Sequence, residues 1–359
     1  MPYTYAIEPA KMFEDRTAQM IGFGIPKSDV DALRKSITDM WADGPGAWVY
    51  EWSAVAKRYA SQGNPFLAAM MYGWAKFPCL ANQAKANAMQ LEVEQYLAAS
   101  KSFPVSFERR SITVPYAGGT TDVWVHFLGG PRNRKQSPVL LVSGGVDTWK
   151  MDLHNLFVSL QQGTGLTVMA FDHPGTGETK VPLNRAGDEV IFGLIQAARE
   201  IGDGRVAHFA ISFGSNFTAM TGLSGAVDVA IDLGGPVTAA FKPDNLKNLP
   251  YGMADIVGNA AGFDAKPDAE ALKAAVAQVD RGALLKNRNN CPMLVINGAD
   301  DYFVPQADTL VFQGRPQTEV HLIPGTGHCA ISKMNEVMPI MVGWLKKWAA
   351  NGNVEAKAS

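Results

Sequence analysis

The spacing of apolar residues changes near residue 105 and divides the chain into two regions. Before this point, Ala, Leu and Met recur at helical spacing, as in "NPFLAAMMYGWAKFP" and "ANQAKANAMQLEVEQYLAAS". Glycines and prolines break this region into about four predicted helices. Four of the eight tryptophans of the chain occur here. We therefore expect residues 1–105 to form a helical module that packs onto a larger core.

After residue 105, short apolar strands alternate with helices. "FERRSITVP" and "TDVWVHFL" alternate like an antiparallel hairpin, with a predicted turn at residues 117–120. Six continuous apolar runs follow: "PVLLVSGG", "GLTVMAFD", "RVAHFAIS", "VDVAIDLGG", "CPMLVING" and "EVHLIPG". Such runs are typical of strands buried on both faces of a parallel sheet. The helical stretches between them, such as 187–200 and 331–349, indicate an open α/β sheet.

One interval, residues 236–290, contains only helix and turn patterns. An insertion at this place usually covers the carboxyl ends of the strands, where ligands bind. The sequence thus predicts an α/β fold, a mostly parallel sheet with helices on both faces. Its core is formed by residues 106–235 and 291–350, with a helical cap at 236–290 and a tail at 351–359.

The strongest local motif is "VAHFAISFGSNFTAM", in which an apolar strand leads directly to Ser212 and then to a helix. A serine at the tip of such a turn is typical of a nucleophile elbow. The tight turn requires small residues two positions before and after the serine, and Ala210 and Gly214 meet this requirement. The alternative interpretation is that Ser212 only caps the helix that follows.

A nucleophilic serine needs a base, and the base needs an acid that orients it. Two predicted strands end in suitable motifs downstream, "LVINGADDYFVP" with Asp301 and "LIPGTGHCA" with His328. The order Ser, Asp, His along the chain is that of α/β-hydrolases. The spacing within the first motif favours Asp301 over Asp300, and Asp232 is a further candidate acid.

The remaining histidines are weaker candidates for the base. His208 lies inside a predicted strand and is expected in the core, and His126, His154 and His321 have no motif around them. His173, in "FDHPGTGET", lies at a strand end. It either shapes a turn or contacts substrate.

Acyl transfer also requires donors for the negative oxygen that develops in the reaction. The N–H of Phe213, directly after the serine, is one candidate. In "LLVSGGVDTW" the N–H of Gly145 or Val146 is the other. Asp147 follows in the same loop and is either a helix N-cap or a substrate contact.

Composition narrows the class of protein. Lys+Arg total 32 and Asp+Glu total 34, so no bulk positive charge favours a nucleic-acid or membrane partner. Three widely spaced cysteines, Cys79, Cys291 and Cys329, fit neither a disulfide framework nor a zinc site. The N-terminus lacks a signal-peptide pattern. We expect a cytoplasmic enzyme that acts on a small-molecule substrate without a cofactor or metal. The sequence leaves open whether the protein forms a homodimer.

The chain resembles the α/β-hydrolase superfamily, through "PVLLVSGGVDTWKMDLHNLF", "VMAFDHPGTGET", "VAHFAISFGSN" and "AIDLGGPV". More narrowly, it is similar to the family of fermentation-respiration-switch esterase-like proteins, 2,6-dihydroxypseudooxynicotine hydrolase and fungal polyketide-shortening hydrolases. The resemblance implies an α/β-hydrolase fold, with an N-terminal helical module over the core and the active site between them. It also places the family's triad on Ser212, Asp301 and His328. Ala210 and Glu178 depart from the usual motifs.

These observations predict a serine hydrolase for a small to medium, largely apolar carbonyl substrate, with ester cleavage as the default. The main alternative is hydrolysis of a carbon–carbon bond in a β-diketone or polyketide-like substrate, for which Asp147 or His173 would steady the enolate. A regulatory protein that keeps the fold without catalysis is the third hypothesis.

Overall fold

An eight-stranded sheet forms the centre of the molecule. The computed structural model describes residues 2–358, and the strand order is β1-β2-β4-β3-β5-β6-β7-β8. The strands are β1 (Phe107–Tyr116), β2 (Gly119–Leu128), β3 (Val139–Ser143), β4 (Thr167–Phe171), β5 (Val206–Ile211), β6 (Val229–Leu233), β7 (Met293–Gly298) and β8 (Thr318–Ile323). Strands β3 to β8 run parallel, while β2 is antiparallel to β1 and β4. The mostly parallel α/β sheet is therefore confirmed.

Burial follows the position of each strand in the sheet. Every residue of β3, β4, β5, β6 and β7 is buried, as the continuous apolar runs predict. Strand β8 is only partly buried, because it lies at the edge of the sheet. The prediction of burial on both faces is wrong for this strand.

The hairpin turn is tighter than expected. Tyr116 pairs with Gly119, so only Ala117 and Gly118 lie in the turn, with φ of 49° and 78°. Two consecutive residues with positive φ are characteristic of the type I′ turn, whose twist matches that of the strands it joins.

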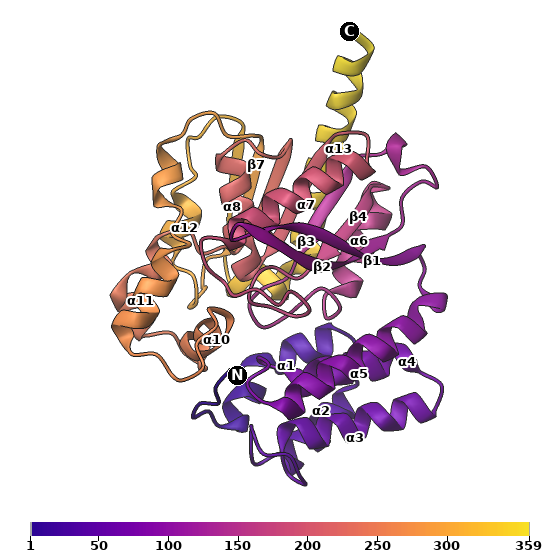
Figure 1. The fold of residues 1–359 in the computed structure, drawn as a ribbon, viewed down its shortest axis with the longest axis vertical. Coiled ribbons are helices and arrows are strands. Elements are labelled where there is room, and N and C mark those ends of the chain that lie inside the picture. Colours follow the sequence, from indigo (N-terminus) through magenta and orange to yellow (C-terminus); the bar gives the residue numbers. More distant parts are fainter. Residues whose placement is uncertain (1, 359) are drawn as a thin grey trace.

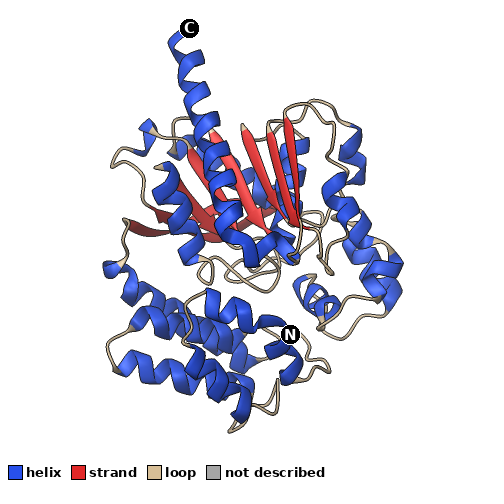
Figure 2. Ribbon diagram, turned by 180° about the vertical axis from the view of Figure 1, so that it is seen from behind, coloured by secondary structure: helices blue, strands red, loops and turns tan. Residues whose placement is uncertain are grey.

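Helices cover both faces of the sheet (Figures 1 and 2). On one face lie α7 (Gly187–Ile201) and α8 (Ser215–Leu223), and on the other lie α6 (His154–Thr164) and α13 (Met334–Ala358). Helix α12 (Gln306–Leu310) contacts β7 and β8. Helix α13 continues through residues that the sequence analysis assigned to a tail, up to Ala358. Within residues 2–358, no helix has the length and apolarity needed to cross a bilayer.

The first part of the chain forms five α-helices rather than about four (Figure 1). They are α1 (Pro9–Gly22), α2 (Lys27–Ser36), α3 (Trp48–Ser61), α4 (Pro65–Lys76) and α5 (Gln83–Ala99). Asn64 and Asn82 cap α4 and α5, since each side chain accepts a hydrogen bond from a backbone N–H in the first turn. We call this part the helical module.

The tryptophans of the module pack differently from the expectation. Trp48 and Trp52 are fully buried, and with Trp74 they lie against Phe13 and Phe77 inside the module. The module therefore has a hydrophobic core of its own, to which the α/β core adds Met151.

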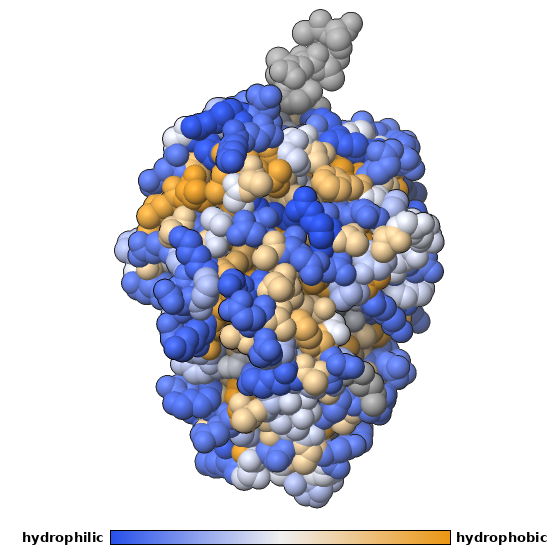
Figure 3. All heavy atoms as spheres, turned by 60° about the vertical axis from the view of Figure 1, so that its left-hand side comes forward, coloured by the Kyte–Doolittle hydropathy of each residue, from blue (hydrophilic) through white to orange (hydrophobic). Residues whose placement is uncertain are grey.

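Residues 236–290, the segment after β6, consist of helices, turns and irregular backbone and are called the cap. Its α-helices are α9 (Pro243–Lys247), α10 (Met253–Ala260) and α11 (Ala269–Ala277). The start of the chain lies against it, because Tyr3 N donates to Asn259 Oδ1 and Asn259 Nδ2 donates to Tyr3 O, both at 3.0 Å. Module, cap and sheet thus meet around the carboxyl ends of the strands. On the face shown in Figure 3, apolar residues are interspersed among hydrophilic ones.

Candidate active site

Ser212 lies at the sharp turn between β5 and α8. Its φ is 58°, a left-handed conformation that non-glycine residues rarely adopt. A Cβ at Gly214 would lie 2.1 Å from Gly144 O and 3.1 Å from the Ala210 Cβ, so the turn leaves no space for larger residues. This geometry is that of a nucleophile elbow, and a helix N-cap alone does not require it.

Ser212, His328 and Asp301 form a continuous chain of hydrogen bonds. Ser212 Oγ lies 2.7 Å from His328 Nε2, and His328 Nδ1 lies 2.7 Å from Asp301 Oδ2. The three residues follow β5, β8 and β7, whose carboxyl ends share one edge of the sheet. The structure therefore brings together three side chains that lie 116 and 27 positions apart along the chain.

The surroundings of Asp301 stabilise its charged form. Burial raises the pKa of this carboxyl, but the neighbouring His328 and hydrogen bonds from Asn297 and the Phe303 N–H outweigh burial, and the net shift is downward. Burial lowers the pKa of His328. The Cys329 sulfur and the Asp301 carboxylate raise it by more than burial lowers it, so the pKa of His328 lies well above its usual value.

The two alternative acids lie elsewhere. Asp300 contributes its backbone N–H to Thr326 O at 3.0 Å. Asp232 is buried within β6, where one carboxylate oxygen accepts the Gly235 N–H at 2.9 Å. Burial raises the pKa of Asp232 to about 7. Within the described residues, neither carboxylate is hydrogen-bonded to a histidine.

The loop after β3, residues 144–153, approaches Ser212 closely. A Cβ at Gly145 would lie 2.9 Å from Ser212 Cβ and 3.1 Å from its Oγ, so only glycine fits here. The Gly145 N–H is already bonded to Thr148 O at 2.9 Å. In the part of the chain that the structure describes, no acceptor is bonded to the N–H of Val146 or Phe213, and both residues line a cavity at Ser212.

Asp147 and His173 are placed differently. Asp147 lines the cavity at Ser212 and accepts hydrogen bonds from Arg16 Nη2 at 2.8 Å and Thr148 Oγ1 at 3.1 Å. It caps no helix, because α6 begins at His154. His173 is fully buried, donates from Nδ1 to Pro174 O at 2.9 Å and does not line either cavity at Ser212. Burial lowers its pKa to about 4, so the ring is neutral at pH 7.

Other histidines lie in the interior. His208 is buried in β5 and hydrogen-bonds to Thr221 at 2.9 Å, which confirms its expected place in the core. His154 is bonded to Tyr96 through Nδ1 at 2.8 Å. Within residues 2–358, no group of His, Cys, Asp and Glu side chains is arranged to hold a metal ion.

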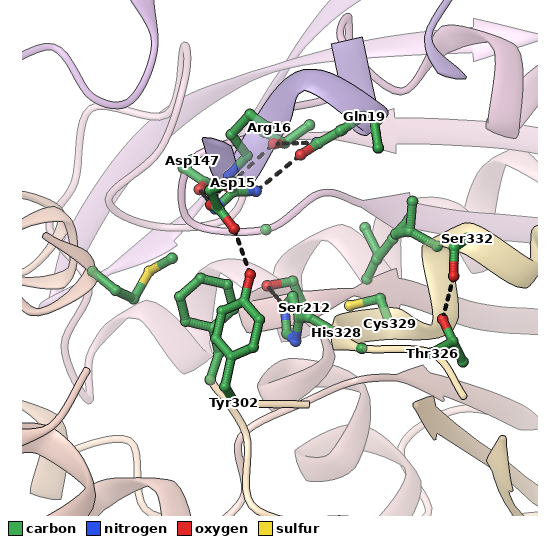
Figure 4. A pocket seen from close by; sticks show the side chains of 18 of the residues that line it. Asp15, Arg16, Gln19, Asp147, Ser212, Tyr302, Thr326, His328, Cys329 and Ser332 are labelled. Atoms are coloured by element: carbon green, nitrogen blue, oxygen red, sulfur yellow. Dashed lines mark hydrogen bonds and ion pairs between the residues drawn. The ribbon is translucent and has the colours of Figure 1, made fainter. Parts of the chain in front are cut away.

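A cavity of about 300 Å³ lies between the helical module and Ser212. One wall is polar and carries residues that the sequence analysis did not single out: Asp15, Arg16, Gln19 and Tyr302. Figure 4 shows Asp15, Arg16 and Asp147 gathered on the side of the cavity where α1 lies, with the Tyr302 hydroxyl bonded to Asp15. Arg16 shares a helix face with the buried Met12 and Met20. A charged residue on an apolar helix face is rarely buried unless it is paired. The position of Arg16 between Met12 and Met20 was therefore the feature of the sequence that could have identified it.

A second cavity of about 50 Å³ lies under the cap and also opens on Ser212. The cap contributes apolar side chains from its helices and connecting turns, among them Phe241, Leu246, Leu249, Met253, Val257 and Val276. The two cavities therefore meet at the same serine and differ in both size and lining.

A mostly parallel sheet with a serine on the β5–α8 turn, and with a histidine and an aspartate at neighbouring strand ends, defines the α/β-hydrolase fold. Residues 27–325 match the family model described as "Esterase FrsA-like". The chain belongs to this family, and it is a hydrolase of the α/β-hydrolase type.

Named relatives and solved structures agree with this assignment. An esterase FrsA from Photobacterium profundum is 25% identical over 292 residues, which cover 75% of this chain and 69% of that protein. An esterase FrsA from Enterobacter is 26% identical over 284 residues, covering 74% and 68%. The structure of AbyA5 superimposes with a TM-score of 0.77 and 18% identity, over 94% of this chain and 99% of that one. A 2,6-dihydroxy-pseudo-oxynicotine hydrolase gives a TM-score of 0.73 and 18% identity, over 94% and 96%. At 18% identity, these two structures show that the fold is shared and nothing more.

Proposed function

We propose that this hydrolase is a serine esterase in which Ser212 is the nucleophile, His328 the general base and Asp301 the acid that orients the base. The observation that carries the proposal is the pair of 2.7 Å hydrogen bonds that connects the three side chains. A serine hydroxyl becomes nucleophilic only when a base in hydrogen-bond contact accepts its proton.

In the first half of the reaction, His328 Nε2 takes the proton from Ser212 Oγ as the oxygen attacks the ester carbonyl. Asp301 accepts a hydrogen bond from the Nδ1–H of the ring, which fixes the tautomer and stabilises the imidazolium that forms. His328 then gives its proton to the leaving alcohol oxygen. Ser212 is left acylated.

The negative oxygen of the tetrahedral intermediate is held by the N–H groups of Phe213 and Val146. Both are unbonded among the described residues, whereas the Gly145 N–H is already bonded within its own loop. Gly145 contributes space, since any side chain there would collide with Ser212. Removing one such donor typically costs about 10²–10³ in rate.

In the second half, a water molecule enters through the larger cavity and His328 removes its proton. The hydroxide attacks the acyl carbonyl, and His328 returns the proton to Ser212 Oγ. This releases the carboxylic acid and restores the free enzyme. The esterase names in the family support ester cleavage, and the burial of His173 removes one of the two groups considered for an enolate.

Labelling with a fluorophosphonate probe tests the assignment. The intact protein should be labelled and should hydrolyse 4-nitrophenyl acetate, and Ser212→Ala should abolish both. Ser224→Ala, at the exposed end of α8, is the matched control and should retain both. Turnover that survives Ser212→Ala, or cleavage of a β-diketone without cleavage of any ester, would overturn the proposal.

A further inference from the structure

The two cavities at Ser212 give the substrate two different surroundings. The larger has a polar wall with Asp15, Arg16 and Asp147, and the smaller is apolar except for Ser212 and His328. An ester that reacts at Ser212 carries one substituent on each side of its carbonyl carbon. The cavities therefore select the two substituents separately.

The smaller cavity lies on the acyl side. It is lined by Val146 and Phe213, the residues whose N–H groups would hold the carbonyl oxygen. Ser212 and His328 line both cavities, whereas Val146 and Phe213 line only the smaller one, so the larger cavity is left for the leaving portion of the ester. The alcohol portion of the ester consequently occupies the larger cavity.

The size of the smaller cavity limits the acyl group. One water-sized group needs about 10–15 Å³, so 50 Å³ accommodates a chain of about three or four heavy atoms. A polar atom in this apolar lining would lose its hydration without gaining a partner. A short hydrocarbon acyl chain suits these conditions.

The charge of the larger cavity constrains the alcohol portion. Asp15, Arg16 and Asp147 are its charged residues besides His328, two acids and one base, with side chains exposed by 3, 10 and 6%. Arg16 is paired with both acids, because Nε lies 2.6 Å from Asp15 Oδ2 and Nη2 donates to Asp147 at 2.8 Å, while Nη1 donates to Gln19 at 2.9 Å. An anionic group would find no free cation here and would face the excess carboxylate.

An aromatic ring adds to the preference for positive charge. Tyr302 is 53% exposed and lines the same cavity, and its hydroxyl donates to Asp15. The face of an aromatic ring attracts cations, quaternary ammonium groups included. In a partly buried site, a carboxylate within a few ångströms also acts more strongly than in bulk water.

We infer that the substrate class is an ester with a short apolar acyl chain and a cationic alcohol portion. The acyl chain lies in the smaller cavity, and the cation lies beside Asp15, Asp147 and Tyr302. This inference rests on the proposed esterase function and names the substrate class for the same site.

Three butyrate esters of matched size test the charge preference: butyrylcholine, its neutral isostere 3,3-dimethylbutyl butyrate, and the anionic 3-sulfopropyl butyrate. We expect kcat/KM to fall about tenfold from the cationic to the neutral ester, and again by at least tenfold to the anionic ester. Raising the salt concentration from 0.05 to 0.5 M should reduce both ratios, since screening weakens charge interactions at a partly open site.

Charge variants locate the effect. Asp15→Asn and Asp147→Asn should each lower the ratio of cationic to neutral ester at least threefold, while the neutral ester reports any general loss of activity. Glu14→Gln is the matched control, because Glu14 neighbours Asp15 on α1 but is exposed and pairs with Lys11 outside the cavity. Its ratio should equal that of the unchanged protein.

The outcomes separate the inference from the proposed function. If fluorophosphonate labels Ser212 and the neutral ester is cleaved, but the cationic ester is not preferred, the charge inference is wrong and the esterase proposal stands. If the anionic ester is preferred, the inference is likewise overturned. If no ester is cleaved and no label is incorporated, both fail.

Discussion

Arg16 of the helical module and Asp147 of the loop after β3 form a buried ion pair, with Nη2 2.8 Å from Oδ2. Asp147 directly follows Val146, whose N–H is unbonded among the described residues and is one of the two proposed oxyanion donors. A side chain from the first twenty residues thus fixes a loop of the hydrolase core. The pair joins the module to the loop that approaches Ser212.

We expect Arg16→Met to destabilise the protein by about 3 kcal/mol, because loss of one partner leaves a buried carboxylate uncompensated. A double-mutant cycle with Asp147→Asn, followed by thermal unfolding, should give a coupling energy above about 1 kcal/mol. The pair between Arg58 and Asp29 lies inside the module, and the Arg58 side chain is half exposed. The same cycle on this control pair should give less than about 1 kcal/mol. Equal coupling in both pairs would contradict the prediction.

The activity should depend on pH through His328. The base must be neutral to accept the serine proton, and the net shift places its pKa well above the usual 6.5. The value of kcat/KM for a neutral ester should therefore rise with pH, with a midpoint above 6.5, and be lost as the pH falls below it. Stopped-flow or plate assays from pH 5 to 9 measure this profile.

Asp301→Asn should shift that midpoint downward, since the carboxylate that raises the pKa of His328 is removed. The rate should fall by about 10⁴, the loss found for the equivalent change in a serine protease. Asp300→Asn is the matched control, because this neighbouring residue is bonded through its backbone. A comparable loss in the control would argue against Asp301 as the acid.

Asp232 should make stability depend on pH in the opposite direction to most acidic residues. Its pKa is raised by burial from 3.8 to about 7, so the folded state favours the neutral form. The associated stability is present below about pH 4 and is lost as the pH rises through 7, a cost of up to about 4 kcal/mol. Asp232→Asn keeps the acceptor for Gly235 and should raise the unfolding midpoint more at pH 8.5 than at pH 5. An equal gain at both pH values would show that charge burial is not the cause.

The acyl-chain limit should move when the smaller cavity is enlarged. Val276 lines this cavity from α11, so Val276→Ala should shift the preferred 4-nitrophenyl ester toward longer chains by about one or two carbons. Leu272→Ala, one turn earlier on the same helix, does not touch the cavity and should leave the chain-length profile unchanged. The ratio of kcat/KM for hexanoate and butyrate is the measurement.

Much of the fold follows from local patterns in the sequence. The continuous apolar runs identify β3 to β7 because those strands are buried on both faces. The same pattern overstates the burial of β8, because a run of apolar residues does not reveal which strand lies at the edge. Likewise, the tryptophans of the first hundred residues indicate dense packing but do not reveal which part of the protein they pack against. Trp48 and Trp52 pack inside their own module.

The candidate site likewise contains residues that could be predicted from the sequence and residues that could not. Ser212, Asp301 and His328 each follow a strand, so their meeting at one edge of the sheet could be predicted from the order of the motifs. Arg16 and Asp15 could not be placed, because their position depends on how the helical module docks on the sheet. That docking is a long-range contact, and no local pattern specifies it.

The separate hydrophobic core of the helical module has a consequence for how the protein is made. During synthesis the N-terminal part of a chain emerges and folds first. The helix that carries Arg16 is then complete before Ser212 has been translated. Roughly two hundred further residues must be synthesised before the surface on which this helix docks is present. The cavity lined by Arg16 and Ser212 is complete only when the two parts have docked, so it forms after the helical module has folded.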